Sequence, residues 1–246
     1  RGNKVACPEN TLAAFRQALV DGADIIETDL HLSADGRVGV FHDDHISDLT
    51  DGVGKVRGRD WAGLAELDAA YHFDPEGGYP LRGTGIGIPL FADVVAAFPD
   101  VLWNLDLKQA GIERAVAEEV IRLGIEDQVL IGSFHDARIR EFRRITQGRV
   151  ATSAGPRETA RALAAATAGM APRGKADAFQ VPEGVGPLTV AGKRFIRMAH
   201  RAGKQVHVWT VNEKVEMRRL LDLGVDGIVT DRPDLLNEVL EERGTE

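Results

Sequence analysis

Two carboxylates stand two residues apart in the otherwise apolar segment Ile25-Ile26-Glu27-Thr28-Asp29-Leu30. Alternate residues of a strand share one face, so Glu27 and Asp29 project to one side and their apolar neighbours to the other. Two carboxylates this close repel each other unless a cation or a shared proton compensates them. Hard divalent cations such as Mg²⁺ and Ca²⁺ prefer oxygen ligands, so the pair predicts a metal site. Hydrogen bonding to helix N-termini or to an arginine is the alternative.

The same alternation recurs in the segment Asn104-Leu105-Asp106-Leu107-Lys108. Its three polar residues share one face, and the two leucines project to the other. Asp106 would add a third metal ligand, and Lys108 would add a cation for an anionic substrate. A plain ion pair between the two is the alternative, but it does not explain why this face of a strand is so polar.

His42 follows the apolar segment Val38–Phe41 and lies close in sequence to the carboxylate pair. Imidazole titrates near neutral pH, so a histidine at this place predicts a general acid or base. Six other histidines are present, and most are expected to be structural. His31 is the strongest candidate among them, because it shares the strand face of Glu27 and Asp29.

Two further residues are candidates for contact with a substrate. Trp209 lies near the end of an apolar segment and shares a face with His207 and Val211, which predicts an indole wall of a pocket. A tryptophan of the hydrophobic core is the alternative. Gln180 ends the preceding predicted strand in a similar way and would offer its side-chain amide to the substrate.

These residues need a scaffold that brings strand ends together, and the chain has the pattern of one. Strands rich in β-branched residues alternate with helices of 3.6-residue periodicity, which predicts an α/β fold with a parallel sheet. The predicted strands cover 24–32, 101–107, 128–134, 149–153, 176–181, 205–211 and 227–230. The predicted helices cover 11–20, 112–123, 137–145, 158–168, 190–202, 215–223 and 234–243.

Eight βα units make a (β/α)₈ (TIM) barrel, which we favour over a doubly wound sheet. The helix at 11–20 requires a preceding strand, so we expect the first strand of the barrel to lie upstream of Arg1. Active sites of such barrels lie at the carboxyl ends of the strands. Glu27, Asp29, Asp106 and Lys108 all occur late in their predicted strands.

The alternation is interrupted once. Asp35-Gly36 between two apolar segments predicts a tight hairpin turn, and residues 43–89 then lack the βα pattern. Five glycines make 71–89 a predicted irregular loop, with a disordered excursion as the alternative. We therefore expect a single domain, 1–246, with a lid-like insertion at 43–89 after the second strand.

Composition excludes several classes of protein. The 246 residues carry a formal net charge of −8 and only 6% aromatics, which argues against a nucleic-acid binder or an anionic-membrane binder. The single cysteine, Cys7, excludes an internal disulfide and a cysteine-based zinc site. No uncharged segment approaches the roughly 20 residues that span a bilayer, so no membrane insertion is expected. A cytoplasmic location is expected, unless a signal peptide precedes Arg1.

Several short motifs occur in an order that resembles the glycerophosphodiester phosphodiesterase family. The motifs are Arg1-Gly2, Pro8-Glu9-Asn10-Thr11, Glu27-x-Asp29, Asp35-Gly36, His42-Asp43, Thr50-Asp51-Gly52-x-Gly54, Asp106-x-Lys108, Trp209-Thr210-Val211-Asn212 and Gly227-Ile228-Val229-Thr230-Asp231-x-Pro233. Each motif is short, but the ordered set covers nearly the whole chain.

The resemblance implies a TIM barrel with a small insertion after the second strand. It implies metal ligands at Glu27, Asp29 and Asp106, the last of which is usually glutamate in the family. It also implies catalytic roles for His42 and for Arg1, which contacts the phosphate together with Lys108. Glu9 and Asn10 would open the first helix and hold the site in place.

A second catalytic histidine of the family directly precedes the Arg-Gly motif, so we expect it immediately upstream of Arg1.

The expected activity is metal-dependent hydrolysis of a glycerophosphodiester to an alcohol and sn-glycerol 3-phosphate, with Mg²⁺ or Ca²⁺ as the cofactor. His42 would protonate the leaving alkoxide, and the substrate would be a small molecule. Residues 67–89 resemble a subgroup that takes larger substrates, which leaves a lysophospholipase D as the alternative. A phosphodiester-binding barrel without turnover is the alternative if the upstream histidine is absent. The oligomeric state is left open.

Overall fold

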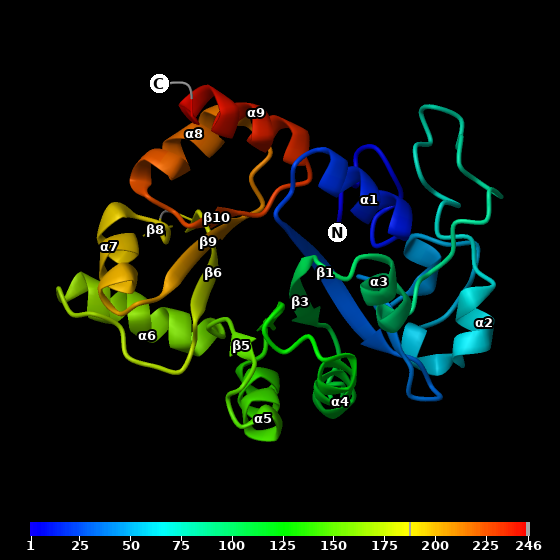
Figure 1. Cartoon of the computed structure of the whole chain (residues 1–246), viewed down its shortest axis with the longest axis horizontal. Helices are drawn as coiled ribbons and strands as arrows, with labels where there is room; N and C mark the ends of the chain where they lie inside the picture. The colour runs from blue at the N-terminus through cyan, green and yellow to red at the C-terminus, as the bar shows by residue number, and fades with distance from the viewer. Residues whose placement is uncertain (187, 245–246) are drawn as a thin grey trace. The chain divides into compact units, whose positions relative to one another are not determined.

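The computed structural model describes residues 1–186 and 188–244. Helices and strands alternate along the chain (Figure 1), and most strand pairs are parallel, which confirms the expected α/β class. The chain forms two compact units, Arg1–Val129 and Leu130–Glu246, which are described separately below.

The first unit contains the strands that carry most of the predicted site. Its elements are α1 (Leu12–Val20), β1 (Ile25–Leu32), β2 (Val38–Val40), the 3₁₀ turns η1 (Ile46–Asp48) and η2 (Val56–Gly58), α2 (Trp61–Ala65), α3 (Phe91–Ala97), β3 (Leu102–Leu107) and α4 (Glu113–Leu123). β1 pairs with β2 in antiparallel and with β3 in parallel orientation.

The β1–β2 pair is the predicted hairpin, with Leu30 opposite Val40 and Leu32 opposite Val38. Gly36 in its turn has a φ of +81°, a conformation that glycine adopts at little cost. The hairpin returns the chain toward β1, and His42 follows two residues after β2 ends.

The alternation within β3 has a clear packing cause. Trp103 is fully buried, and the rings of Phe15 and Phe91 meet it edge-on at centroid distances of 5.8 and 6.5 Å. Leu105 and Leu107 lie on the same buried face. Burial of this apolar face directs Asn104 and Asp106 to the opposite face of β3, as predicted from the sequence, and Lys108 follows directly after the strand.

Residues 71–89 contain no helix or strand, which confirms the predicted irregular loop. The insertion nevertheless has a hydrophobic core of its own, made of Phe41, Ile46, Val56, Leu64, Leu67, Ala69 and Ile88. Within the loop, the Arg82 guanidinium lies 4.1 Å from the ring centroid of Tyr71 and 3.7 Å from that of Tyr79. Such cation–π contacts favour the conformation in which Arg82 lies against both rings.

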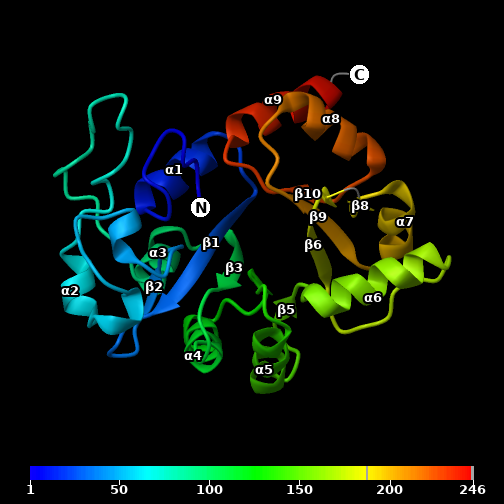
Figure 2. The same ribbon diagram turned by 180° about the vertical axis from the view of Figure 1, so that it is seen from behind.

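The second unit continues the repeating βα pattern. Its elements are β4 (Val129–Gly132), which begins at the unit boundary, α5 (Asp136–Thr146), β5 (Ala151–Thr152), α6 (Pro156–Thr167), β6 (Ala178–Pro182), β7 (Gly184–Val185), β8 (Leu188–Thr189), α7 (Lys193–Arg201), β9 (Gln205–Trp209), α8 (Lys214–Leu223), β10 (Gly227–Ile228) and α9 (Pro233–Gly244). β9 lies between β6 and β10 in a parallel sheet. Figure 2 shows α6, α7 and α8 around these strands.

The predicted elements agree with the observed ones to within a few residues at each end. The short helices α2 and α3 and the β7–β8 hairpin were not predicted, because elements of two to seven residues carry little periodicity. In the described residues, the strands do not close into a continuous hydrogen-bonded ring. The assignment of 1–246 as one domain stays a prediction. None of the described helices is both long enough and apolar enough to cross a membrane.

Candidate active site

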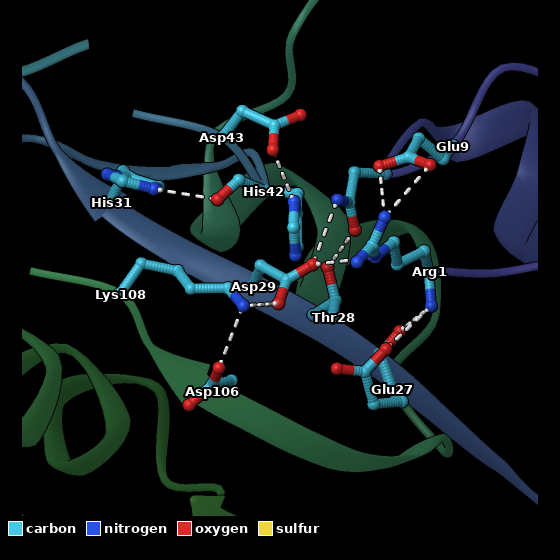
Figure 3. Close-up of polar contacts among 11 residues, drawn as sticks. Arg1, Glu9, Glu27, Thr28, Asp29, His31, His42, Asp43, Asp106 and Lys108 are labelled. Carbon is cyan, nitrogen blue, oxygen red and sulfur yellow. Dashed lines mark hydrogen bonds and ion pairs between the residues drawn. The ribbon is translucent and has the colours of Figure 1, made fainter. Parts of the chain in front are cut away.

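The predicted carboxylates lie on adjacent strands of the first unit (Figure 3). Asp29 on β1 is the register partner of Asp106 on β3, and Glu27 is that of Asn104. The polar faces of the two strands therefore form one continuous surface, with Asp29 and Asp106 at the same level.

Lys108 connects the two aspartates. Its Nζ lies 2.9 Å from Asp29 Oδ1 and 2.9 Å from Asp106 Oδ2. Burial opposes the charged state of both Lys108 and Asp29, but their mutual attraction outweighs it. The pKa of Asp29 is consequently lowered, and the pKa of Lys108 is raised. The group is a compact set of ionised side chains on a surface with little access to water.

Arg1 occupies the other side of Asp29. Its Nη1 donates to both carboxylate oxygens of Glu9, at 3.0 and 3.2 Å, and its Nε lies 3.4 Å from Asp29 Oδ2. Its terminal amine donates to Glu27 Oε2 at 2.8 Å. Burial opposes the charge of the guanidinium, but Glu9 and Asp29 raise the pKa of Arg1 above its ordinary value.

Asn10 makes hydrogen bonds to both Asp29 and Arg1 and so fixes their positions relative to each other. Its Nδ2 donates to Asp29 Oδ2 at 3.2 Å, its Oδ1 accepts from Thr28 Oγ1 at 2.8 Å, and its backbone N–H donates to the Arg1 carbonyl at 3.1 Å. The residue has a φ of +56°, a conformation that asparagine tolerates better than most residues. Helix α1 begins just after it and is capped by Thr11, whose Oγ1 accepts from the Ala14 N–H at 3.2 Å.

His42 is oriented by the residue that follows it. Its Nδ1 lies 2.7 Å from Asp43 Oδ1. An ionised carboxylate only accepts hydrogen bonds, so the Asp43 contact places a hydrogen on Nδ1. Figure 3 shows the other ring nitrogen on the side of Asp29. This is the arrangement that a general acid or base needs, with one nitrogen anchored and the other directed at the site.

His31 is buried beside this group, on β1. Its Nε2 lies 3.1 Å from the carbonyl oxygen of His42, and its Nδ1 lies 3.2 Å from Gln109 Oε1. Burial lowers the pKa of His31, which favours the neutral ring. The side chain contacts the segment that carries His42 and the segment that follows Lys108.

The oxygen donors of the site fit a divalent cation. Four carboxylates, those of Glu9, Glu27, Asp29 and Asp106, lie around only two side-chain cations, those of Arg1 and Lys108. Burial raises the pKa of Glu27; the terminal ammonium opposes this rise, and the neighbouring Asp29 adds to it. A hard cation bound to these oxygens would relieve the repulsion.

One of these carboxylates, Glu9, also belongs to a second group of potential ligand atoms. One ligand atom each from Glu9, His42 and Asp43 lies within 4.8 Å of the others. Among the described residues, Glu27, Asp29 and Asp106 do not form such a group, and their role as metal ligands stays a prediction.

Trp209 and Gln180 belong to the second unit. The Trp209 ring meets that of Phe134 edge-on, at a centroid distance of 5.6 Å. Gln180 is paired with His207 in the sheet, and its Nε2 is buried without a hydrogen-bond partner among the described residues. Their roles in substrate binding stay predictions.

The partners of the two site histidines were not expected from the sequence. Asp43 as the partner of His42 is signalled only by its adjacency to that residue. Gln109 as the partner of His31 has no sequence signal, because the two residues are 78 positions apart. Both contacts depend on where a loop places a side chain.

Comparison with known proteins gives consistent results. The model of the Glycerophosphoryl diester phosphodiesterase family matches residues 1–235. The "Probable glycerophosphodiester phosphodiesterase 2" of Mycobacterium tuberculosis is 35% identical over 242 residues, which are 96% of this chain and 87% of that protein.

Solved structures match the fold over nearly the full length. A glycerophosphodiester phosphodiesterase from Agrobacterium tumefaciens is 26% identical with a TM-score of 0.80, over 97% of this chain and 96% of that one. An Oleispira antarctica phosphodiesterase in complex with its product sn-glycerol-3-phosphate matches with a TM-score of 0.78 at 22% identity, over 98% and 94%. The structural matches confirm the barrel fold class. Together with the family match they confirm the resemblance, and the chain is an enzyme that belongs to the glycerophosphoryl diester phosphodiesterase family.

Proposed function

We propose that the chain hydrolyses small glycerophosphodiesters to an alcohol and sn-glycerol 3-phosphate in a reaction that depends on Mg²⁺ or Ca²⁺. The arrangement of Asp29 and Asp106 around Lys108, beside Arg1 and an oriented His42, carries this proposal. The site combines oxygen donors for a hard cation, two fixed cations for a phosphate and one imidazole for proton transfer. A phosphodiester is the substrate class that uses all three.

Residues of the first unit would bind the metal, bind the phosphate and transfer protons. Glu27, Asp29 and Asp106 would hold the cation, which supplies positive charge to the phosphate in the transition state. Arg1 presents a planar guanidinium that matches phosphate oxygens, and Lys108 supplies a compact charge. His42 would protonate the leaving alkoxide, with Asp43 holding its ring. A histidine directly before Arg1 would activate the nucleophile.

Gln180 and Trp209 lie in the second unit. The buried Nε2 of Gln180 is a donor that finds no acceptor among the described residues, as expected for a group that binds a ligand. Trp209 is partly exposed and packs against Phe134, which suits an apolar wall of a binding pocket. Both are proposed as substrate-binding residues.

Turnover of glycerophosphocholine with Mg²⁺, with Ca²⁺ and with EDTA tests the proposal. We expect metal-dependent release of glycerol phosphate, and no release with EDTA. His42→Ala should abolish turnover, whereas His45→Ala, which removes an exposed imidazole, should not. Full turnover by His42→Ala would contradict the assigned role. Metal binding without any turnover would favour the phosphodiester-binding barrel.

A lysophospholipase D is the second candidate, because one relative carries that activity in its name. The "Lysophospholipase D GDPD1" of Rattus norvegicus is 23% identical over 256 residues, which are 94% of this chain and 82% of that protein. The loop at 71–89 would contact a larger substrate. Release of choline from lysophosphatidylcholine, without turnover of glycerophosphocholine, would favour this candidate.

A further inference from the structure

We propose that His31 is a positioning residue that holds the main chain of His42 against β1 and so sets where the His42 imidazole lies. The inference rests on the proposed function, because it assigns His31 to the support of the proton-transferring residue. The family match and the motifs do not assign His31 a role.

The first observation is that both ring nitrogens of His31 are engaged. The Nε2 atom lies 3.1 Å from the carbonyl oxygen of His42, and the side chain is 2% exposed. A carbonyl oxygen only accepts hydrogen bonds, so Nε2 carries the hydrogen. The Nδ1 atom lies 3.2 Å from Oε1 of the Gln109 side-chain amide. With the hydrogen on Nε2, Nδ1 of the neutral ring is an acceptor, so this contact is a hydrogen bond when the amide is turned to present its nitrogen.

The second observation is the identity of the segments that His31 connects. It lies two residues beyond Asp29 on β1, it contacts the backbone of His42, and its other partner directly follows Lys108. One buried ring therefore connects the segments that carry the proposed metal ligands, general acid and phosphate-binding lysine. Figure 3 shows its contact with the His42 carbonyl.

His42 needs such support, because it lies outside regular structure. Strand β2 ends at Val40, and the side chain of His42 is anchored by its immediate neighbour Asp43, which lies in the same irregular segment. The His31 contact is thus a link from His42 itself to the strand that holds Asp29. Misplacement of a catalytic group by about 1 Å can cost on the order of 100-fold in rate.

Two near-isosteric substitutions separate the two contacts of the ring. In His31→Gln the side-chain nitrogen takes the position of Nε2 and keeps a donor for the His42 carbonyl. In His31→Asn the side-chain nitrogen takes the position of Nδ1 and loses the His42 contact. His31→Leu removes both contacts and keeps an apolar side chain of similar volume.

We expect His31→Gln to keep kcat within a few-fold of the wild type. His31→Asn and His31→Leu should lower kcat by about 10- to 100-fold for glycerophosphocholine, with little change in KM. Thermal unfolding of all three variants accompanies the assay, so that loss of fold is not read as loss of positioning. Equal kcat values for His31→Gln and His31→Asn, at comparable melting temperatures, would overturn the proposal. A change in KM alone would overturn it as well.

NMR of the protein labelled with ¹⁵N-histidine provides a readout that does not need turnover. The His31 ring should show its hydrogen on Nε2, and the His42 ring signals should shift in His31→Asn but not in His31→Gln. Unchanged His42 signals in His31→Asn would overturn the proposal. Absence of turnover in the wild type, with these shifts present, would instead overturn the proposed function.

Discussion

Asp29 on β1 and Asp106 on β3 are direct register partners, and Lys108 Nζ lies 2.9 Å from a carboxylate oxygen of each. Adjacent parallel strands place two like charges side by side, and Lys108, which directly follows β3, compensates both. The predicted metal ligands and the predicted phosphate-binding lysine therefore form one electrostatic unit. A change in any of the three residues changes the environment of the other two.

Lys108→Met should destabilise the fold in the absence of metal. The two aspartates would lose their shared cation while remaining largely buried, which costs about 3 kcal/mol in the free energy of unfolding. Mg²⁺ or Ca²⁺ should restore part of the loss if the carboxylates bind it. Denaturant unfolding with and without metal measures both effects.

The matched control is Lys55→Met. Lys55 also forms a 2.8 Å ion pair, with Asp44, but both side chains are largely exposed. Such a surface pair contributes less than about 1 kcal/mol. Equal losses for the two variants would contradict the buried electrostatic unit.

A chain that includes a histidine directly before Arg1 should turn over faster than a chain that begins at Arg1. The addition turns the terminal ammonium, which now contacts Glu27, into an amide and supplies an imidazole next to the site. A positioned general base contributes about 10²- to 10⁴-fold in rate, so kcat should rise by a comparable factor. Steady-state kinetics with glycerophosphocholine measures the gain.

Glutamine placed before Arg1 is the control for that experiment. It also removes the terminal charge from the Glu27 contact and adds one residue, but it cannot transfer a proton at neutral pH. Comparable kcat values for the glutamine and histidine versions would show that the gain comes from the lost charge and not from a base.

Gly2→Ala should disrupt the position of Arg1. Gly2 has a φ of +76°, and a Cβ atom there would lie 2.6 Å from the backbone carbonyl carbon of Ala14 in α1. Relief of this contact requires the segment that carries Arg1 to move away from α1. Circular dichroism and kinetics should show a loss of stability together with a larger KM.

The loss expected for Gly2→Ala has two causes, the strain of a positive φ and the contact of the new Cβ with Ala14. Gly36→Ala separates them. Gly36 also has a positive φ, of +81°, but nothing lies within 4 Å of a Cβ built there. Gly36→Ala should lower the free energy of unfolding only by the conformational strain of about 1–2 kcal/mol. Similar effects on KM for both substitutions would contradict the steric explanation.

His207 should make the second unit less stable at mildly acidic pH. Burial on β9 lowers the pKa of His207 below its ordinary value of 6.5, although Asp226 opposes the shift. The unfolded chain therefore binds a proton at a higher pH than the folded chain does. Stability is fully present above about pH 6.5 and falls as the pH decreases toward the folded-state pKa.

Thermal melts between pH 8 and pH 5 should show a smaller decrease for His207→Gln than for the wild type. His135→Gln, which replaces an exposed imidazole, is the control. A wild-type decrease that His207→Gln leaves unchanged would assign the pH dependence to other groups.

The sequence alone determined the features that depend on local periodicity. Residues two apart on a strand share a face, so the co-facing pairs Glu27 with Asp29 and Asp106 with Lys108 were predictable, as was the β1–β2 hairpin. The alternation of strands and helices and the ordered motifs were sufficient for the fold class and the family. The reason is that strand and helix geometry repeats every two to four residues, so the spacing of apolar and polar residues indicates it directly.

Only the tertiary structure decided which distant side chains meet. The register of β1 on β3 places Asp29 beside Asp106, and loop geometry brings Glu9 to Arg1 and Gln109 to His31. These contacts depend on strand register, on positive-φ residues such as Asn10 and on burial, none of which repeats along the chain. A buried polar group must find a partner wherever the fold provides one, so its partner follows from the packing and not from spacing in the sequence.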